Sequence, residues 1–214
     1  MKRIKTILMM IVILTITASS AFSQEAFSPR FTIKTNPLAA LGGPFWVAII
    51  PVTGEYKVLF EAKTLPKQSV TVGASYIGPS LLLNLDELSA DGEDISGINT
   101  AGFKVQLMYK FFISRNTEAP EGFYVGPHGS YASASITSKD VLEDKIGMTK
   151  MNVNAVIGYQ MITDGGFTLD FYTGFGFKDM KWSFEGDSGE VFELDVNDKA
   201  SPSVAFGLNF GYAF

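Results

Sequence analysis

The segment 203–214 alternates strictly between large apolar residues and small or polar ones. The large apolar residues take every even position: Val204, Phe206, Leu208, Phe210, Tyr212 and Phe214. The odd positions hold Ser203, Ala205, Gly207, Asn209, Gly211 and Ala213. Because successive side chains of a strand point to opposite faces, this pattern predicts a strand with one bulky apolar face and one small face. A small inner face suits a narrow barrel, so we expect the closing strand of a transmembrane β-barrel with its even positions against lipid.

The first residues have the three parts of a secretory signal peptide. Residues 2–5 carry three basic side chains, an apolar run covers 7–16, and Ala21 and Ser23 supply small residues at the cleavage positions. We therefore expect a signal peptide at 1–23 that is removed from the mature protein. The apolar run is too short to cross ~30 Å of hydrocarbon as an N-terminal anchor. The absence of cysteine excludes a lipid-modified lipoprotein, a disulfide framework and a cysteine metal site.

Period-two alternation recurs through the rest of the chain and predicts eight strands. They cover approximately 30–40, 46–60, 68–80, 99–114, 122–137, 148–162, 167–183 and 199–214. No apolar run after the signal peptide approaches the length of a transmembrane helix, and in lipid only a closed barrel satisfies the backbone amides of strands. The sequence therefore predicts one all-β domain at 30–214, an eight-stranded antiparallel up-and-down transmembrane barrel, after a short segment at 24–29.

The predicted connections alternate between short turns and longer acidic loops that contain glycine, with 41–45 as a short exception. The short connections are Glu61–Lys67, Arg115–Glu121 and Thr163–Gly166, and the long ones are Leu81–Ile98, Ser138–Gly147 and Phe184–Asp198. Outer-membrane barrels place short turns in the periplasm and long loops outside the cell. The alternation therefore predicts that both termini lie on the periplasmic side.

A soluble barrel of the lipocalin type is the main alternative fold. Such a barrel would turn its apolar faces inward around a ligand. The strand at 167–183 alone would then send five bulky side chains inside, namely Phe167, Leu169, Phe171, Phe175 and Phe177. This is too much bulk for an eight-stranded lumen, so the membrane barrel is the favoured prediction.

From the signal peptide to Phe214, the chain resembles the small eight-stranded outer-membrane barrels of the OmpA/OmpX type in Gram-negative bacteria. The resemblance implies a monomer in contact with outer-membrane lipids and lipopolysaccharide, whose C-terminal strand engages the barrel-assembly machinery. It implies a structural role or interactions through the loops, without a cofactor. OmpA continues into a peptidoglycan-binding domain, whereas this sequence stops at the predicted last strand, so we expect no peptidoglycan tether. No basic cluster points to nucleic acid.

Polar residues gather on the predicted inner faces. The charged and titratable members are Lys34, Glu55, Lys57, Lys104, Lys110, His128, Asp170 and Lys178, and the others are Tyr124, Asn152, Asn154, Gln160 and Asn209. Eight strands leave barely enough room for side chains, so we expect a polar plug in which Glu55 and Asp170 pair with lysines. A narrow passive pore gated by these ion pairs is the alternative. The sequence does not specify which carboxylate meets which lysine.

One constellation is a candidate for catalysis. The segment 126–130 contains His128 and Ser130, and Glu143 follows. The set resembles the lipid A deacylases of the PagL type, which would imply that Ser130 attacks an ester, His128 takes its proton and Glu143 orients the imidazole. Tyr131, however, stands where that family has asparagine. If the odd positions of this strand face lipid, His128 and Ser130 face the lumen, out of reach of a lipid ester. A non-enzymatic barrel is therefore the prediction, with the hydrolase as the alternative.

Two further groups have simpler interpretations. We expect aromatic residues of the membrane interface at Trp46, Tyr56, Tyr109, Trp182 and Phe214. We expect a solvated acidic loop at Asp86, Glu87, Asp91, Glu93 and Asp94. The spacing of these acids does not match the Asp-x-Asp-x-Asp-Gly pattern of a calcium loop, so no metal site is predicted.

Overall fold

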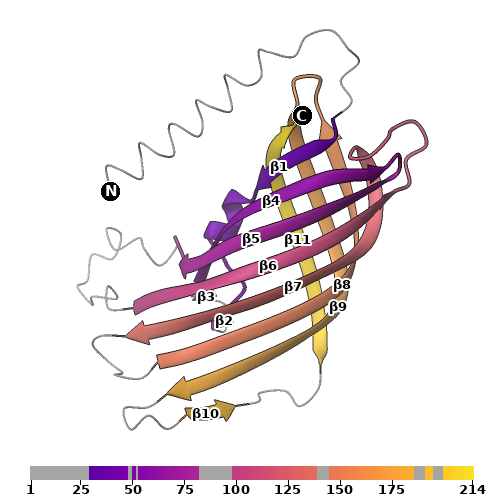
Figure 1. Cartoon of the computed structure of the whole chain (residues 1–214). Coiled ribbons are helices and arrows are strands. Elements are labelled where there is room, and N and C mark those ends of the chain that lie inside the picture. The colour runs from indigo at the N-terminus through magenta and orange to yellow at the C-terminus, as the bar shows by residue number, and fades with distance from the viewer. Residues whose placement is uncertain are drawn as a thin grey trace, which may run out of the picture.

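In the computed structural model, eight strands close into an antiparallel barrel (Figure 1). They are β1 (Phe31–Thr35), β4 (Thr53–Leu65), β5 (Gln68–Pro79), β6 (Ile98–Phe112), β7 (Gly122–Ser138), β8 (Lys145–Ile162), β9 (Phe167–Glu185) and β11 (Ser201–Ala213). Each strand is hydrogen-bonded to the next in this order, and β11 pairs with β1 to complete the circle. The predicted eight-stranded, all-β, up-and-down barrel is confirmed.

The structure describes residues 29–47, 50–51, 53–81, 98–138, 145–185, 191–194 and 200–214. The predicted signal peptide, the acidic loop and Glu143 lie outside these residues. Within the described ranges, no helix is long and apolar enough to cross a membrane.

The barrel buries its charged side chains and exposes large apolar ones on its outer face. Burial alternates along its strands, as in β4, where Glu55 and Lys57 are buried while Tyr56, Val58 and Phe60 are exposed. This is the reverse of a soluble sheet, in which the apolar face is the buried one.

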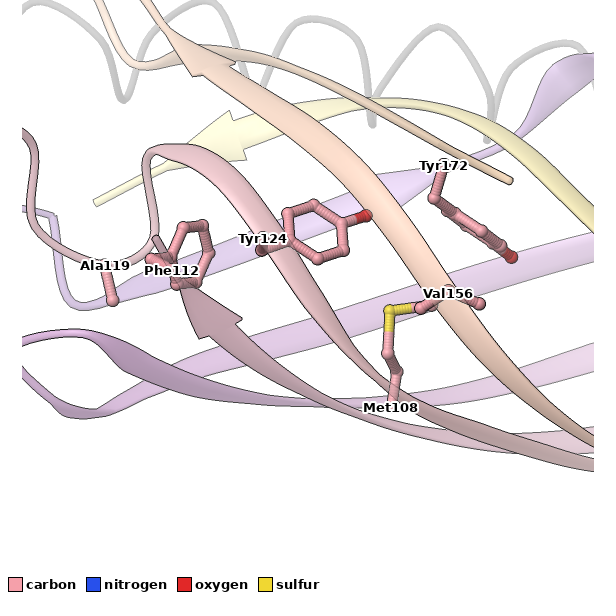
Figure 2. Packing of buried hydrophobic residues seen from close by; sticks show 6 residues of the cluster. All are labelled: Met108, Phe112, Ala119, Tyr124, Val156 and Tyr172. Carbon is pink, nitrogen blue, oxygen red and sulfur yellow. The ribbon is translucent and has the colours of Figure 1, made fainter. Parts of the chain in front are cut away.

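A cluster of buried apolar and aromatic side chains lies inside the barrel (Figure 2). Its members are Met108, Phe112, Ala119, Tyr124, Val156 and Tyr172. Two glycines make room for the large rings. A Cβ atom at Gly158 would overlap the ring of Tyr124, and one at Gly207 would overlap the ring of Tyr172. The small residues of the inner faces therefore allow a narrow barrel to hold two inward tyrosines.

The segment that follows β1 departs from the predicted strands at 30–40 and 46–60. β1 ends at Thr35, and residues Pro37–Ala40 form a 3-10 helix, η1. The Asn36 side chain accepts a hydrogen bond from the Ala39 amide, while Pro37 has no amide hydrogen to satisfy at the helix start. The short strands β2 (Trp46–Val47) and β3 (Ile50–Pro51) then form a separate two-stranded sheet.

One strand end and one additional strand also differ from the prediction. β4 continues to Leu65, so the connection to β5 is only residues 66–67 instead of 61–67. At the other end of the barrel, the short strand β10 (Val191–Leu194) pairs with the last residues of β9 and lies beyond the closed circle (Figure 1).

The two ends of the barrel differ in their connections. The connections 66–67, 113–121 and 163–166 lie at one end of the barrel. The start of β1 and the end of β11 lie at the same end, where the amides of Phe31 and Phe214 each donate to the other's carbonyl at 2.9 Å. We call this the turn end and the opposite one the loop end. At the turn end, a hydrogen bond from the Lys63 ammonium, 2.6 Å from Glu118, holds the pKa of that carboxyl below its usual value.

Because β1 is short, the barrel wall has an incomplete joint. β1 pairs with β11 only over Thr32–Thr35 and Phe210–Ala213. Towards the loop end, Ser201–Asn209 of β11 are paired with β9, and among the described residues no strand pairs with their other edge. The facing stretch of β4, Thr53–Val58, is likewise paired only with β5. We call the space between these two edges the seam.

Candidate functional site: the barrel lumen

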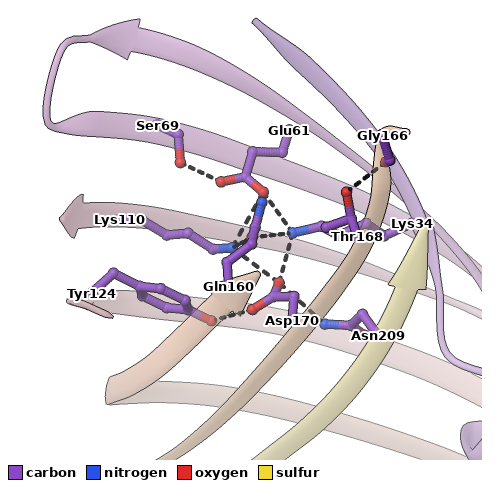
Figure 3. Close-up of polar contacts among 10 residues, drawn as sticks. All are labelled: Lys34, Glu61, Ser69, Lys110, Tyr124, Gln160, Gly166, Thr168, Asp170 and Asn209. Carbon is purple, nitrogen blue, oxygen red and sulfur yellow. Dashed lines mark hydrogen bonds and ion pairs between the residues drawn. The ribbon is translucent and has the colours of Figure 1, made fainter. Parts of the chain in front are cut away.

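Eight buried polar side chains, one from each barrel strand, form a hydrogen-bonded group across the lumen (Figure 3). We call this group the lumenal cluster, and it consists of Lys34, Glu61, Ser69, Lys110, Tyr124, Gln160, Asp170 and Asn209. None of these residues is more than 1% exposed. Because every strand contributes one member, the cluster joins the whole circumference of the wall near the turn end.

Two lysines and two carboxylates form the centre of the lumenal cluster. Lys34 Nζ lies 2.5 Å from Glu61 Oε2 and 2.6 Å from Asp170 Oδ2. Lys110 Nζ lies 3.2 Å and 3.0 Å from the same two oxygens. Each ion therefore contacts two ions of opposite sign, which compensates the desolvation that burial of isolated charges would cost.

The neutral members of the cluster satisfy the remaining positions around the four ions. Gln160 Oε1 accepts from the two lysines at 3.0 Å and 2.7 Å. The Tyr124 hydroxyl donates to Asp170 Oδ1 at 2.6 Å, and the Ser69 hydroxyl donates to Glu61. This is a connected polar network, which specifies one arrangement of the interior more strongly than separate pairs would.

A second charged group lies nearer the loop end. Glu55 Oε2 accepts a hydrogen bond from Lys104 at 3.0 Å, and Glu55 Oε1 accepts one from the Ser75 hydroxyl at 2.8 Å. Lys57 Nζ lies 3.2 Å from the same Oε1 atom. Here two lysines share a single carboxylate, so the group carries an excess of positive charge.

A chamber of about 540 Å³ adjoins this second group. Residues between Asn36 and Pro44 line one side of it, and residues of β4, β6, β7, β8, β9 and β11 line the rest. Lys150 extends into the chamber and donates to the Pro44 carbonyl at 2.9 Å. Short inward residues of β7 and β11, such as Ser130 and Ala205, leave this space open on the loop-end side of the lumenal cluster.

The loop end of the interior is apolar. Phe45, which is completely buried, belongs to a cluster with Ile77, Ala132, Ala134 and Met148. Trp182 is half-buried against this cluster, so its assignment to the aromatic girdle is wrong. It shares the even, inward face of β9 with Asp170. Tyr56 and Phe214 are exposed, as a girdle requires, Tyr109 is half-buried, and the Trp46 side chain is outside the described set.

The structure divides the predicted lumenal residues between these environments. Lys34, Lys110 and Asp170 belong to the lumenal cluster, whereas Glu55, Lys57 and Lys104 form the second group. His128 lines the chamber, and Lys178 is half-buried on the same face of β9 as Asp170.

Several polar residues of the interior are missing from the predicted inner set, among them Glu61, Ser69 and Lys150. The prediction places Glu61 in a turn and does not single out Ser69 or Lys150. The alternation itself holds the signal for Glu61, because Tyr56, Val58 and Phe60 face outward and the next odd position must face inward.

The candidate catalytic residues face the lumen, as the parity of β7 predicts. His128 and Ser130 are buried, and Phe123 and Val125 are exposed on the opposite face. The Ser130 hydroxyl accepts a hydrogen bond from Asn152 at 3.2 Å, whereas neither ring nitrogen of His128 has a hydrogen-bond partner among the described residues. The ring of His128 instead packs 5.9 Å from that of Tyr172. The structure does not bring the serine and the histidine into a hydrogen-bonded pair, and Glu143 lies outside its described part.

Ser130→Ala tests the catalytic alternative. We expect the composition of lipid A to be the same in cells that express the wild type and the variant, as measured by mass spectrometry. Loss of the hydrogen bond from Asn152 should lower the free energy of unfolding by only about 1 kcal/mol. A deacylated lipid A species that is present with the wild type and missing with Ser130→Ala would establish a hydrolase instead, because removal of a catalytic serine abolishes most of the rate.

No group of three or more potential metal-ligating side chains occurs among the described residues. In comparisons with known proteins, no protein-family model matches the chain, and no curated protein matches it.

Proposed function

We propose that the protein is an integral outer-membrane barrel of a Gram-negative bacterium that has a structural role or displays its loops to partners, without enzymatic activity. Its contacts are outer-membrane lipids and lipopolysaccharide, and the barrel-assembly machinery would engage β11. It would act as a monomer with its turn end in the periplasm. The OmpA/OmpX type is the nearest description of such a barrel.

The observation that carries this proposal is the reversed distribution of side chains. Large apolar residues of the outer face are widely exposed, including Phe175 at 72%, Val204 at 68% and Phe206 at 64%. The charges of the lumenal cluster are buried at the same time. An apolar exterior of this extent is unfavourable in water and suits hydrocarbon, in which strands can span only as a barrel. A lipocalin-type barrel needs the opposite arrangement.

The lumenal cluster supports a plugged barrel over a passive pore. Side chains from all eight strands meet inside it, and the four ions hold one another in place. An ion that crossed the lumen would have to break this balanced group, which opposes conduction.

Limited proteolysis of cells tests both the membrane location and its orientation. A glutamate-specific protease has sites at Glu87 and Glu93 in the predicted external loop, and at Glu118 in a connection of the turn end. The Glu118 side chain is 63% exposed in the structure. In intact cells we expect cleavage at Glu87 or Glu93 and none at Glu118.

Permeabilised outer membranes provide the matched control, because the same protease should then also cut at Glu118. Cleavage at Glu118 in intact cells would show the reverse orientation. Recovery of the protein in the soluble fraction, without the difference in gel mobility between heated and unheated barrels, would contradict the membrane location.

A further inference from the structure

The chamber above the lumenal cluster has the chemistry of an anion site. Three lysines, Lys57, Lys104 and Lys150, line it together with one carboxylate, Glu55. No other charged side chain lines it among the described residues. The chamber therefore has more ammonium groups than its own residues neutralise.

Unpaired polar atoms also face this chamber. His128 is only 5% exposed, and both of its ring nitrogens lack a hydrogen-bond partner among the described residues. The side-chain oxygen of Asn154, Oδ1, is also buried without a hydrogen-bond partner among the described residues. Buried polar groups are almost always hydrogen-bonded, so these side chains are arranged for a polar occupant that supplies the missing bonds. The volume falls in the range of about 300–1,000 Å³ that ligand pockets occupy.

The chamber reaches the outer surface at the seam. Its lining includes the inward Ser203 and Ala205 of β11, and also Val204 and Phe206, whose side chains are on the outer face. These residues all lie on the part of β11 whose second edge has no partner strand among the described residues. Across the seam, the lining continues with Leu38, which is 50% exposed. The segment that contains η1 is hydrogen-bonded on the β4 side of the seam, since the Gly43 amide donates to the Thr53 carbonyl and the amide of Leu81, just after β5, donates to the Ala40 carbonyl.

We propose that the chamber binds the anionic headgroup of a single-chain amphiphile that enters from the membrane through the seam. The oxygens of a phosphate or a carboxylate would accept hydrogen bonds from Lys150 and from the N–H group of His128. The acyl chain would leave the wall between Leu38 and Phe206 and remain in lipid. The inference rests on the proposed location in a membrane, because the seam opens on the surface assigned to lipid.

The full chain in nanodiscs of phosphatidylcholine provides the test. Lysophosphatidylglycerol and palmitate serve as the anionic probes, one a phosphate and one a carboxylate, and lysophosphatidylcholine of equal chain length is the zwitterionic control. Native mass spectrometry counts the probe retained by the released protein. We expect retention of at least one anionic probe to exceed that of the control by about tenfold or more, since hydrogen bonds to charged groups have that strength.

Lys150→Gln removes one ammonium from the chamber, and Lys145→Gln on the same strand is the matched control with an exposed side chain outside it. Retention should fall about tenfold in the first variant and stay unchanged in the second.

Equal retention of anionic and zwitterionic probes, or no retention of any, would overturn the proposal. Displacement of the amphiphile by an equal concentration of inorganic phosphate would also overturn it, because the seam would then contribute nothing. A chain that does not insert into nanodiscs would refute the membrane location. The insertion step shows this before any probe is added, so it is distinguished from failure of the amphiphile site.

Discussion

Asp170→Ala should destabilise the barrel by about 3–5 kcal/mol, the usual effect of removing one partner from a buried ion group. In the variant, Lys34 and Lys110 would share the single carboxylate of Glu61, and both are completely buried. The Tyr124 hydroxyl would also lose its acceptor. Urea-induced unfolding of the barrel refolded in lipid vesicles, followed by its change in gel mobility, measures the free energy of unfolding.

Asp179→Ala is the matched control, because Asp179 lies on the same strand and is exposed. Its effect should stay within about 0.5 kcal/mol. The double variant Lys110→Met/Asp170→Asn leaves one lysine with one carboxylate and should be more stable than Asp170→Ala. Equal stabilities for Asp170→Ala and Asp179→Ala would show that the lumenal cluster does not hold the barrel together.

Phe206→Lys should cost about 2–4 kcal/mol of folding free energy in a bilayer, because a lysine on the lipid face near the membrane midplane loses its hydration. Phe206 lies near the middle of β11 and is 64% exposed on the outer face. The fraction of chain that reaches the heat-modifiable, folded form in vesicles, measured across a urea series, reports this loss.

Ala205→Lys is the control on the adjacent residue. Its side chain lines the chamber, where an ammonium can stay hydrated instead of entering hydrocarbon. We expect a markedly smaller loss than for Phe206→Lys. The same loss at both positions would contradict the assignment of the outer face to lipid.

The facing of side chains could be predicted from the sequence, because it depends only on parity within one strand. Once Val204 and Phe206 were placed outside, Ser203 and Asn209 had to be inside, and the structure places them there. The same rule placed His128 and Ser130 in the lumen. Strand ends were harder to predict. The prediction treats 30–40 as one strand, whereas the strand ends at Thr35 and Asn36-Pro37 starts a 3-10 helix.

The partners within the lumenal cluster could not be predicted, because they depend on the stagger between strands. Lys34 and Asp170 are 136 positions apart, yet their side chains meet at 2.6 Å. Shifting any strand pair by two residues would keep every side chain on its own face and still change which ions meet. The seam had no signal in the sequence for a related reason, since it depends on how much of β11 the short β1 covers.

The contact between Lys34 and Asp170 also links the topology of the chain to its electrostatics. The pairing of Thr32 with Ala213 joins the two ends of the sheet, and contacts between such distant residues carry the largest loop-closure entropy. Until β1 docks on β11, Asp170 belongs to one half of an open sheet, and Lys34 and Glu61 belong to the other. Closure of the circle therefore brings Asp170 to Lys34 and completes the set of four ions. The backbone pairing that closes the sheet is also the one that balances the charges of the lumenal cluster.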